Sequence, residues 1–130
     1  MPMIARPSHD KTSKLITFLY YVDLPRAMAF YEDVLGLSLA IDQGWSKIYE
    51  VTPQAYLGLV DEAHGSHRAN PVKPVQVCLR VDDVDAWCAY LQSRGVAIVK
   101  GPKDVPALGI RVIVFDDPEG YQIEIQSVIG

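Results

Sequence analysis

The chain has 130 residues, of which 49% are hydrophobic and 22% charged, and its formal net charge is −4 at pH 7. These values are typical of a globular domain with its own core. They argue against nucleic-acid binding, because the chain is acidic and no cluster of Lys and Arg offers a surface for phosphates. No apolar run reaches the roughly 18 residues of a membrane span, and no signal-peptide pattern is present, so we expect no membrane contact and a cytoplasmic location.

The first half of the chain predicts one β-α-β-β-β unit. Residues 1–13 are expected to be a flexible tail and residues 14–130 a single domain. β-branched and aromatic residues predict a strand over residues 14–22. A helix follows between Asp23 and Gly36, because Ala27, Phe30 and Tyr31 begin an apolar stripe at helical spacing. Strands at 37–42, 45–51 and 55–60 complete module one, at about residues 14–60.

The same plan recurs after a polar linker at residues 61–74. Five residues of the first unit reappear 59 positions later, where Val22, Asp23, Ala27, Tyr31 and Gly36 match Val81, Asp82, Ala86, Tyr90 and Gly95. The second copy predicts a strand at 75–81, a helix from Asp82 to Gly95, and strands at 96–100, 110–115 and 121–127. A Pro-bearing loop precedes the second-last strand, and residues 116–120 form a turn. Module two therefore spans about residues 75–127, and the fold class is α+β.

Two motifs identify a family resemblance. The stretch Val22-Asp-Leu…Phe30-Tyr-Glu-Asp-Val-Leu-Gly-Leu37 and the stretch Phe115-Asp-Asp-Pro-Glu-Gly-Tyr-Gln-Ile-Glu-Ile125 closely resemble the vicinal oxygen chelate superfamily. This superfamily includes glyoxalase I, extradiol dioxygenases, and bleomycin- and fosfomycin-resistance proteins. The resemblance covers about residues 14–127. It implies two tandem modules that form a curved mixed sheet around a cleft, commonly completed in a homodimer, and it specifies no activity.

The resemblance also implies four positions for metal ligands. They fall on Ile16, on about Leu59 (or Gly58 or Val60 after a slip of one residue), on Gln76 and on Glu124. Ile16 and Leu59 have no lone pair to give, and only Glu124 is anionic. Because a tight divalent site in this family needs three or four donors, we expect neither a metal nor another cofactor.

His64 and His67 form the only close histidine pair. On a helix this spacing can present both rings to one ion, but here the pair lies in a polar linker beside Gly65. A solvated loop is the preferred interpretation. Cys78 and Cys88 lack a CxxC pattern and are expected to be buried free thiols.

Glu124 is the principal candidate for catalysis. It shares one face of the last strand with Gln122 and Gln126. Three roles remain open for its carboxylate. It can act as a general base that takes a proton from carbon next to a carbonyl, it can bind an N–H group or a cation of a ligand, or it can be held by Gln76 or the backbone.

Aromatic side chains on the early strands favour an apolar ligand cleft. Phe18 and Tyr20 share the face of Ile16, and Arg80 shares the face of Gln76, from which it can meet a ligand carboxylate or simply end a strand in solvent. The complete set of predicted ligand contacts is Phe18, Tyr20, Trp45, Tyr49, Tyr56, Leu59, Gln76, Arg80, Gln122 and Glu124.

Three functions remain open. The favoured one is a metal-independent small-molecule-binding protein similar to the bleomycin-resistance branch, which sequesters or carries an organic compound as a homodimer. The second is a metal-free isomerase, epimerase or lyase with Glu124 as its base. The third is a metal-dependent glyoxalase or dioxygenase, which Ile16 and Leu59 disfavour.

Overall fold

The computed structural model describes residues 3–129. Module one contains β1 (Leu15–Tyr21), α1 (Leu24–Ala29), β2 (Ser38–Asp42), β3 (Ser46–Thr52) and β4 (Ala55–Asp61). Module two contains β5 (Gln76–Arg80), α2 (Val84–Ser93), β6 (Lys100–Val105), β7 (Ile110–Asp116) and β8 (Gln122–Val128). One π-helical turn continues α1 at Phe30–Val34, and 3-10 turns lie at His9–Lys11 and Pro106–Leu108.

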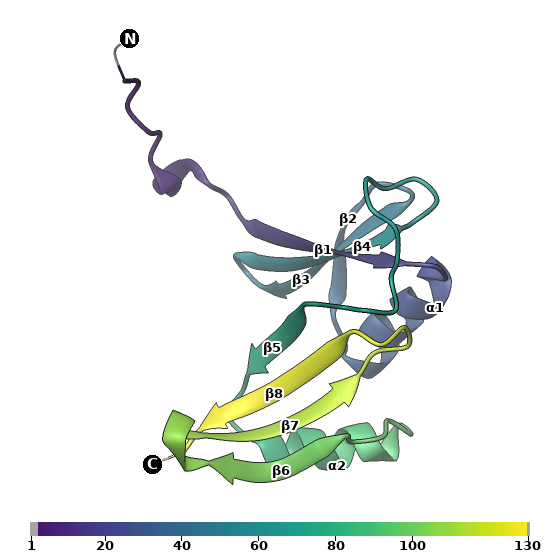
Figure 1. Ribbon diagram of the computed structural model, residues 1–130, viewed down its shortest axis with the longest axis vertical. Helices are drawn as coiled ribbons and strands as arrows, with labels where there is room; N and C mark the ends of the chain where they lie inside the picture. Colours follow the sequence, from purple (N-terminus) through teal and green to yellow (C-terminus); the bar gives the residue numbers. More distant parts are fainter. Residues whose placement is uncertain (1–2, 130) are drawn as a thin grey trace.

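The strands form two four-stranded sheets, ordered β1-β4-β3-β2 and β5-β8-β7-β6. In each sheet the first strand pairs parallel with the last strand of its module, and the other pairings are antiparallel. Figure 1 shows the two sheets as separate layers joined by the linker. The predicted fold of two repeated β-α-β-β-β modules with mixed sheets is confirmed.

The N-terminal residues stand apart from the modules. Residues 1 and 2 of the predicted tail lie outside the described residues. Residues 3–13 are exposed and extend away from both sheets (Figure 1). None of the helices within residues 3–129 combines the length and the apolar composition that crossing a bilayer requires.

The ends of the two helices follow the predicted chemistry, with one correction. The Asp23 side chain accepts a hydrogen bond from the Arg26 N–H, and Asp83, not Asp82, accepts one from the Ala86 N–H. The repeat therefore has an offset of 60 residues at this point, one more than the sequence alignment assumed. Gly36 and Gly95 have φ of 72° and 80°, the left-handed exit that glycine favours.

The prediction for the third-last strand was wrong. Residues 96–99 form no strand, and β6 instead runs from Lys100 to Val105, through the stretch that was predicted to be a Pro-bearing loop. Gly101 and Pro102 disfavour a strand locally. Pairing with β7, which joins Lys103 to Val112 and Val105 to Ile110, overrides that preference.

The helix-bearing faces of both sheets share one core. It includes Leu19, Tyr21, Tyr49, Leu57 and Leu59 of module one, Ile113, Phe115, Ile123 and Ile125 of module two, and Tyr31 and Leu91 of the helical segments. We call the opposite face of each sheet its open face. No residue of this core lies on an open face, so the open faces of both sheets point away from it.

Asp117 is buried where the two modules meet. Its carboxylate accepts hydrogen bonds from the hydroxyls of Tyr21 and Tyr31, at 2.5 and 2.9 Å, and from the backbone N–H groups of Glu119 and Tyr121. Burial of the two phenols raises the pKa of each tyrosine far above the ordinary value for tyrosine, and the negative charge of Asp117 raises it further. Both hydroxyls therefore remain neutral hydrogen-bond donors. The predicted turn at 116–120 thus also connects the two modules.

A second contact reinforces this connection. The Glu119 carboxylate accepts hydrogen bonds from the backbone N–H groups of Val22 and Asp23, at 2.9 and 2.8 Å. It therefore supports the N-terminus of α1, in module one, from the turn of module two.

Candidate functional site

The open face of module one is largely apolar. Ile16, Phe18 and Tyr20 alternate along β1 and lie opposite Tyr56, Gly58 and Val60 of β4. The ring of Phe18 lies directly over Gly58, where a Cβ atom would overlap it. Phe18 remains 43% exposed, so its outer side is available to another molecule.

Two predicted ligand residues lie on the other face. Tyr49 and Leu59 are fully buried in the shared core. Their register explains this placement, since Leu59 pairs with the core residue Leu19 and Tyr49 pairs with Leu57. Neighbouring side chains of one strand point to opposite faces. The ligand position on β4 was predicted only to within one residue, and this difference of one residue decides whether the side chain lies in the core or on the open face.

The linker covers one end of the open face of module one. Gly65 lies against Tyr20 and Val60, and the hydroxyls of Tyr20 and Ser66 are 3.1 Å apart. The His67 ring meets the Tyr20 ring edge to face, with centroids 5.2 Å apart. The linker around His64 and His67, which was predicted to be a solvated loop, therefore packs partly against aromatic side chains.

The remaining aromatic candidates are at the edges of this region. Trp45 precedes β3, is 47% exposed and packs against the His64 ring, with centroids 6.0 Å apart. Tyr56 lies on the open face, where its hydroxyl donates a hydrogen bond to Glu50. The structure thus brings Phe18, Tyr20 and Tyr56 onto one surface.

The open face of module two carries a polar ladder across β5 and β8. Three cross-strand pairs are in register: Gln76 with Gln122, Cys78 with Glu124, and Arg80 with Gln126. The Gln76 amide donates to Gln122 at 2.6 Å, and the Cys78 thiol donates to Glu124 at 3.5 Å.

Glu124 is linked to a cation through this ladder. The Arg80 guanidinium donates two hydrogen bonds to Gln126 Oε1, at 2.8 and 2.6 Å, and Gln126 Nε2 donates to Glu124 Oε2 at 2.7 Å. Sequence reasoning identified no cationic partner for Glu124. The sequence nevertheless contained an indication of this partner. The repeat predicts that the first and last strands of module two are parallel neighbours, and in that pairing Arg80 lies beside Gln126.

A cavity of about 480 Å³ lies on this open face. Gln76, Gln122 and Glu124 form one side of it, and Lys100 and Lys103 of β6 form another. The floor is apolar and consists of Ile110, Val112 and Val114 of β7. The two lysines were missed because residues 100–105 show no strand pattern in the sequence.

Cys78 is exposed, in contrast to the predicted buried thiol, whereas Cys88 is buried. Desolvation at the sheet surface, the hydrogen bond to Glu124 and the charge of that carboxylate raise the pKa of the Cys78 thiol to about 11. The thiol is therefore protonated and weakly reactive near neutral pH.

Replacing Glu124 by Gln is expected to lower the pKa of Cys78 and to speed its alkylation. At pH 8, well below the pKa, each unit of decrease raises the thiolate fraction about tenfold and lowers thiolate nucleophilicity by about a factor of three, which leaves a net acceleration of about threefold. Iodoacetamide labelling followed by mass spectrometry measures the rate. A Cys78→Ser variant identifies the background from Cys88, and an unchanged rate in Glu124→Gln would show that the two groups do not interact.

The donor set does not fit the metal site that the resemblance implies. At the first ligand position, Ile16 has no donor atom. The second position is Gly58, because Gly58 pairs with Phe18 in module one as Glu124 pairs with Cys78 in module two. Gly58 has no side chain to bind a metal. Within residues 3–129, no group of three or more His, Cys, Asp or Glu side chains is arranged to hold a metal ion. Gln76 and Glu124 alone do not make a tight divalent site.

Comparisons with known proteins agree on the fold. Lactoylglutathione lyase of Haemophilus influenzae is 30% identical over 128 residues, covering 85% of this chain and 88% of its own length. TnmS3, an antibiotic-binding protein from Streptomyces sp. CB03234, is 32% identical with a TM-score of 0.70, covering 88% of this chain and 94% of its own. A glyoxalase/bleomycin resistance protein/dioxygenase from Nocardioides has a TM-score of 0.75 at 23% identity, covering 98% of this chain and 87% of its own.

A family model also matches most of the chain. It covers residues 14–125, from the start of β1 to the middle of β8, and thus both modules and both motifs. The protein therefore belongs to the Glyoxalase/Bleomycin resistance protein/Dioxygenase superfamily.

Proposed function

We propose that this protein is a metal-independent small-molecule-binding protein that holds an organic ligand against its open faces. The observation that carries the proposal is the apolar filling of module one, where Ile16 and the Phe18 ring over Gly58 occupy the region of two metal ligands. Such a face gains about 25 cal/mol for each Å² of apolar ligand surface it buries, and offers a cation no lone pair. The likeness to an antibiotic-binding protein supports the same role.

The two open faces suit different parts of one ligand. Module one offers the exposed Phe18 ring and the neighbouring Tyr20 and Tyr56, which favour flat apolar groups. Module two offers the Glu124 carboxylate and the Gln122 amide beside an apolar floor, which favour a hydrogen-bond donor. The expected ligand thus combines a ring-bearing body with a donor group.

We include a homodimer in the proposal. The shared core occupies the helix-bearing faces, so the open faces of one chain do not pack on each other. A second copy that brought its module two against module one of the first would enclose a ligand between an apolar and a polar face. The partial exposure of Phe18 is consistent with such an arrangement.

A metal-free isomerase, epimerase or lyase is the second candidate. The observation in its favour is that Glu124 lines the cavity with one carboxylate oxygen, Oε2, held by Gln126 and Cys78, while Oε1 has no hydrogen-bond partner within residues 3–129. A carboxylate positioned in this way can accept a proton from a substrate. The names of several relatives favour a metal-dependent lactoylglutathione lyase instead, but the donor set does not fit that function.

Metal analysis and turnover assays separate the three functions. Protein purified without chelator should contain well below one equivalent of Mn, Fe, Ni or Zn, and should not turn over lactoylglutathione with or without these ions. A full equivalent of metal with metal-dependent turnover would contradict the proposal. Turnover without metal that disappears in Glu124→Gln would favour the second candidate.

Binding to the open face is tested with an uncharged ring-bearing apolar probe, N-phenyl-1-naphthylamine. Phe18→Asp should weaken probe binding about tenfold or more, because it places a charge where apolar surface is buried. Val72→Asp, which adds the same charge at an exposed linker residue, is the matched control. Equal binding by the two variants would contradict a ligand site on this face.

A further inference from the structure

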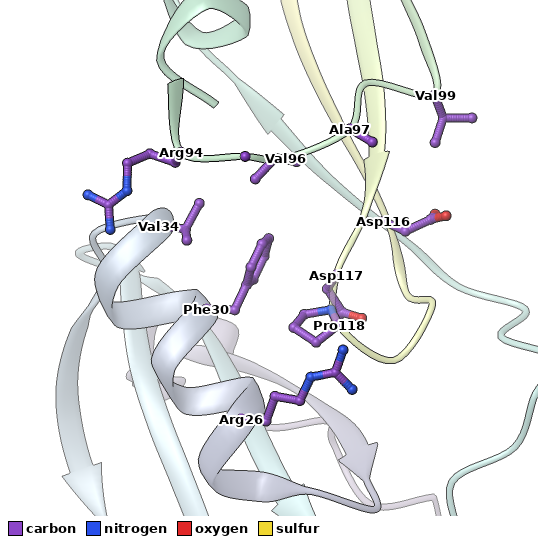
Figure 2. Close-up of a pocket in the computed structure, with 11 residues that line it drawn as sticks. Arg26, Phe30, Val34, Arg94, Val96, Ala97, Val99, Asp116, Asp117 and Pro118 are labelled. Carbon is purple, nitrogen blue, oxygen red and sulfur yellow. The ribbon is translucent and has the colours of Figure 1, made fainter. Parts of the chain in front are cut away.

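A second cavity lies at the junction of the modules, and Val99 is the one lining residue that it shares with the cavity on the open face of module two. Its volume is about 360 Å³. Figure 2 shows how three segments meet there: α1 and its π-helical turn, the residues that follow α2, and the turn after β7. Arg26, Phe30 and Val34 are spaced four residues apart, so they line the cavity along one helical face.

The cavity combines an apolar interior with two cationic ends. Phe30, Val34, Val96 and Pro118 provide the apolar surface, and the Phe30 ring meets the Tyr31 ring edge to face and the Phe115 ring at a tilt. Arg26 and Arg94 lie at different ends, as Figure 2 shows. A flat apolar molecule with one charged end therefore matches the lining.

These two arginines differ from every other arginine in the described part of the chain. Arg68, Arg80 and Arg111 bind backbone carbonyls, a glutamine or carboxylates, and Arg6 binds the Pro7 carbonyl. Arg26 and Arg94 have no side-chain hydrogen bond and no ion pair within residues 3–129. Their ten guanidinium N–H donors are thus free to bind an anion.

The acidic groups of the lining do not compete for these arginines. The Asp117 carboxylate already accepts four hydrogen bonds from Tyr21, Tyr31, Glu119 and Tyr121. The Asp116 side chain points away from Phe30 in Figure 2. The free charge inside the cavity is therefore positive.

We propose that the junction cavity binds a small aromatic carboxylate. The carboxylate pairs with Arg26 or Arg94 in the two-pronged geometry that guanidinium groups favour, and the ring packs against Phe30 and Pro118. Because both modules contribute to the lining, the bound molecule stabilises their junction and raises the thermal midpoint of unfolding. This site is independent of the ligand site proposed on the open faces.

Titration with 2-naphthoate tests the proposal, with uncharged 2-naphthamide as the ligand control. For a ligand of this size we expect a Kd of about 1 mM or tighter, measured by calorimetry or by the shift in thermal midpoint. The double variant Arg26→Gln/Arg94→Gln should weaken binding about tenfold, since each residue is exposed and solvent screens part of the attraction. Arg6→Gln removes one charge in the N-terminal segment and should leave binding unchanged.

The same titration in Phe18→Asp distinguishes this site from the open face. Naphthoate affinity should be unchanged in this variant, while affinity for N-phenyl-1-naphthylamine falls about tenfold or more. Naphthoate affinity that depends on Phe18 and not on Arg26 and Arg94 would overturn the junction site and leave the open-face proposal intact. The absence of saturable binding up to about 10 mM would also overturn it.

Discussion

Replacing Asp117 by Ala is expected to lower the free energy of unfolding by about 3–5 kcal/mol. The side chain is 5% exposed and accepts four hydrogen bonds. Its removal leaves the Tyr21 and Tyr31 hydroxyls and two backbone N–H groups buried without their acceptor. Because the tyrosines belong to module one and the carboxylate to module two, the loss also weakens the junction between the modules.

Urea unfolding followed by circular dichroism measures this effect. Asp116→Ala is the matched control, because Asp116 is adjacent in the chain but exposed and should change stability by no more than about 0.5 kcal/mol. Asp117→Asn retains the shape of the side chain and should fall between the two. Equal stability of the Asp117→Ala and Asp116→Ala variants would refute the proposed role of the buried carboxylate.

Replacing Gly101 by Ala is expected to cost about 3 kcal/mol or more. Gly101 has φ of 88°, a conformation that costs a residue with a Cβ about 1–2 kcal/mol. A Cβ at this position would also overlap the backbone carbonyl oxygen of Val112, which cannot move without breaking the pairing of β6 with β7. The strand that carries Lys100 and Lys103 should therefore separate from the sheet.

Gly44→Ala isolates the conformational part of this cost. Gly44 has a similar φ of 77°, but a Cβ there would meet no atom within 4 Å. Its replacement should cost only about 1–2 kcal/mol. If the two alanine variants had the same stability in urea, and amide exchange in β6 were unchanged in Gly101→Ala, the steric argument would be wrong.

The modular fold was predictable because its signals are local and repeated. The helical stripe that begins at Ala27 and Phe30 has the period of one buried face, and Gly36 and Gly95 mark the ends of both helices. Because the same order of strands and helix occurs twice in the sequence, the prediction of each element in one module supports the prediction of its counterpart in the other. Asp83 shows the limit of this approach, since two adjacent aspartates compete for one cap and only the hydrogen bond to the Ala86 N–H distinguishes them.

The candidate site was predictable in part. Gln76, Gln122 and Glu124 were placed together because their strands alternate with a period of two, and they lie together on one side of a cavity. Leu59 and Tyr49 were assigned to the cleft but lie in the core. A shift of one residue reverses the face of every side chain on a strand, and hydrophobic residues on both faces of β4 gave no signal to detect it.

The sequence alone determined the modules, the order of their elements and the family, because helical periodicity, strand alternation and turn residues act over a few neighbouring positions. Only the tertiary structure decided the course of β6, the role of Asp117 and the cavity between Arg26 and Arg94. Each of these depends on residues that are far apart in the chain, such as Tyr21 and Asp117 or Phe30 and Val96. The free energy of such contacts arises from burial and from hydrogen bonds between partners that local sequence patterns do not specify.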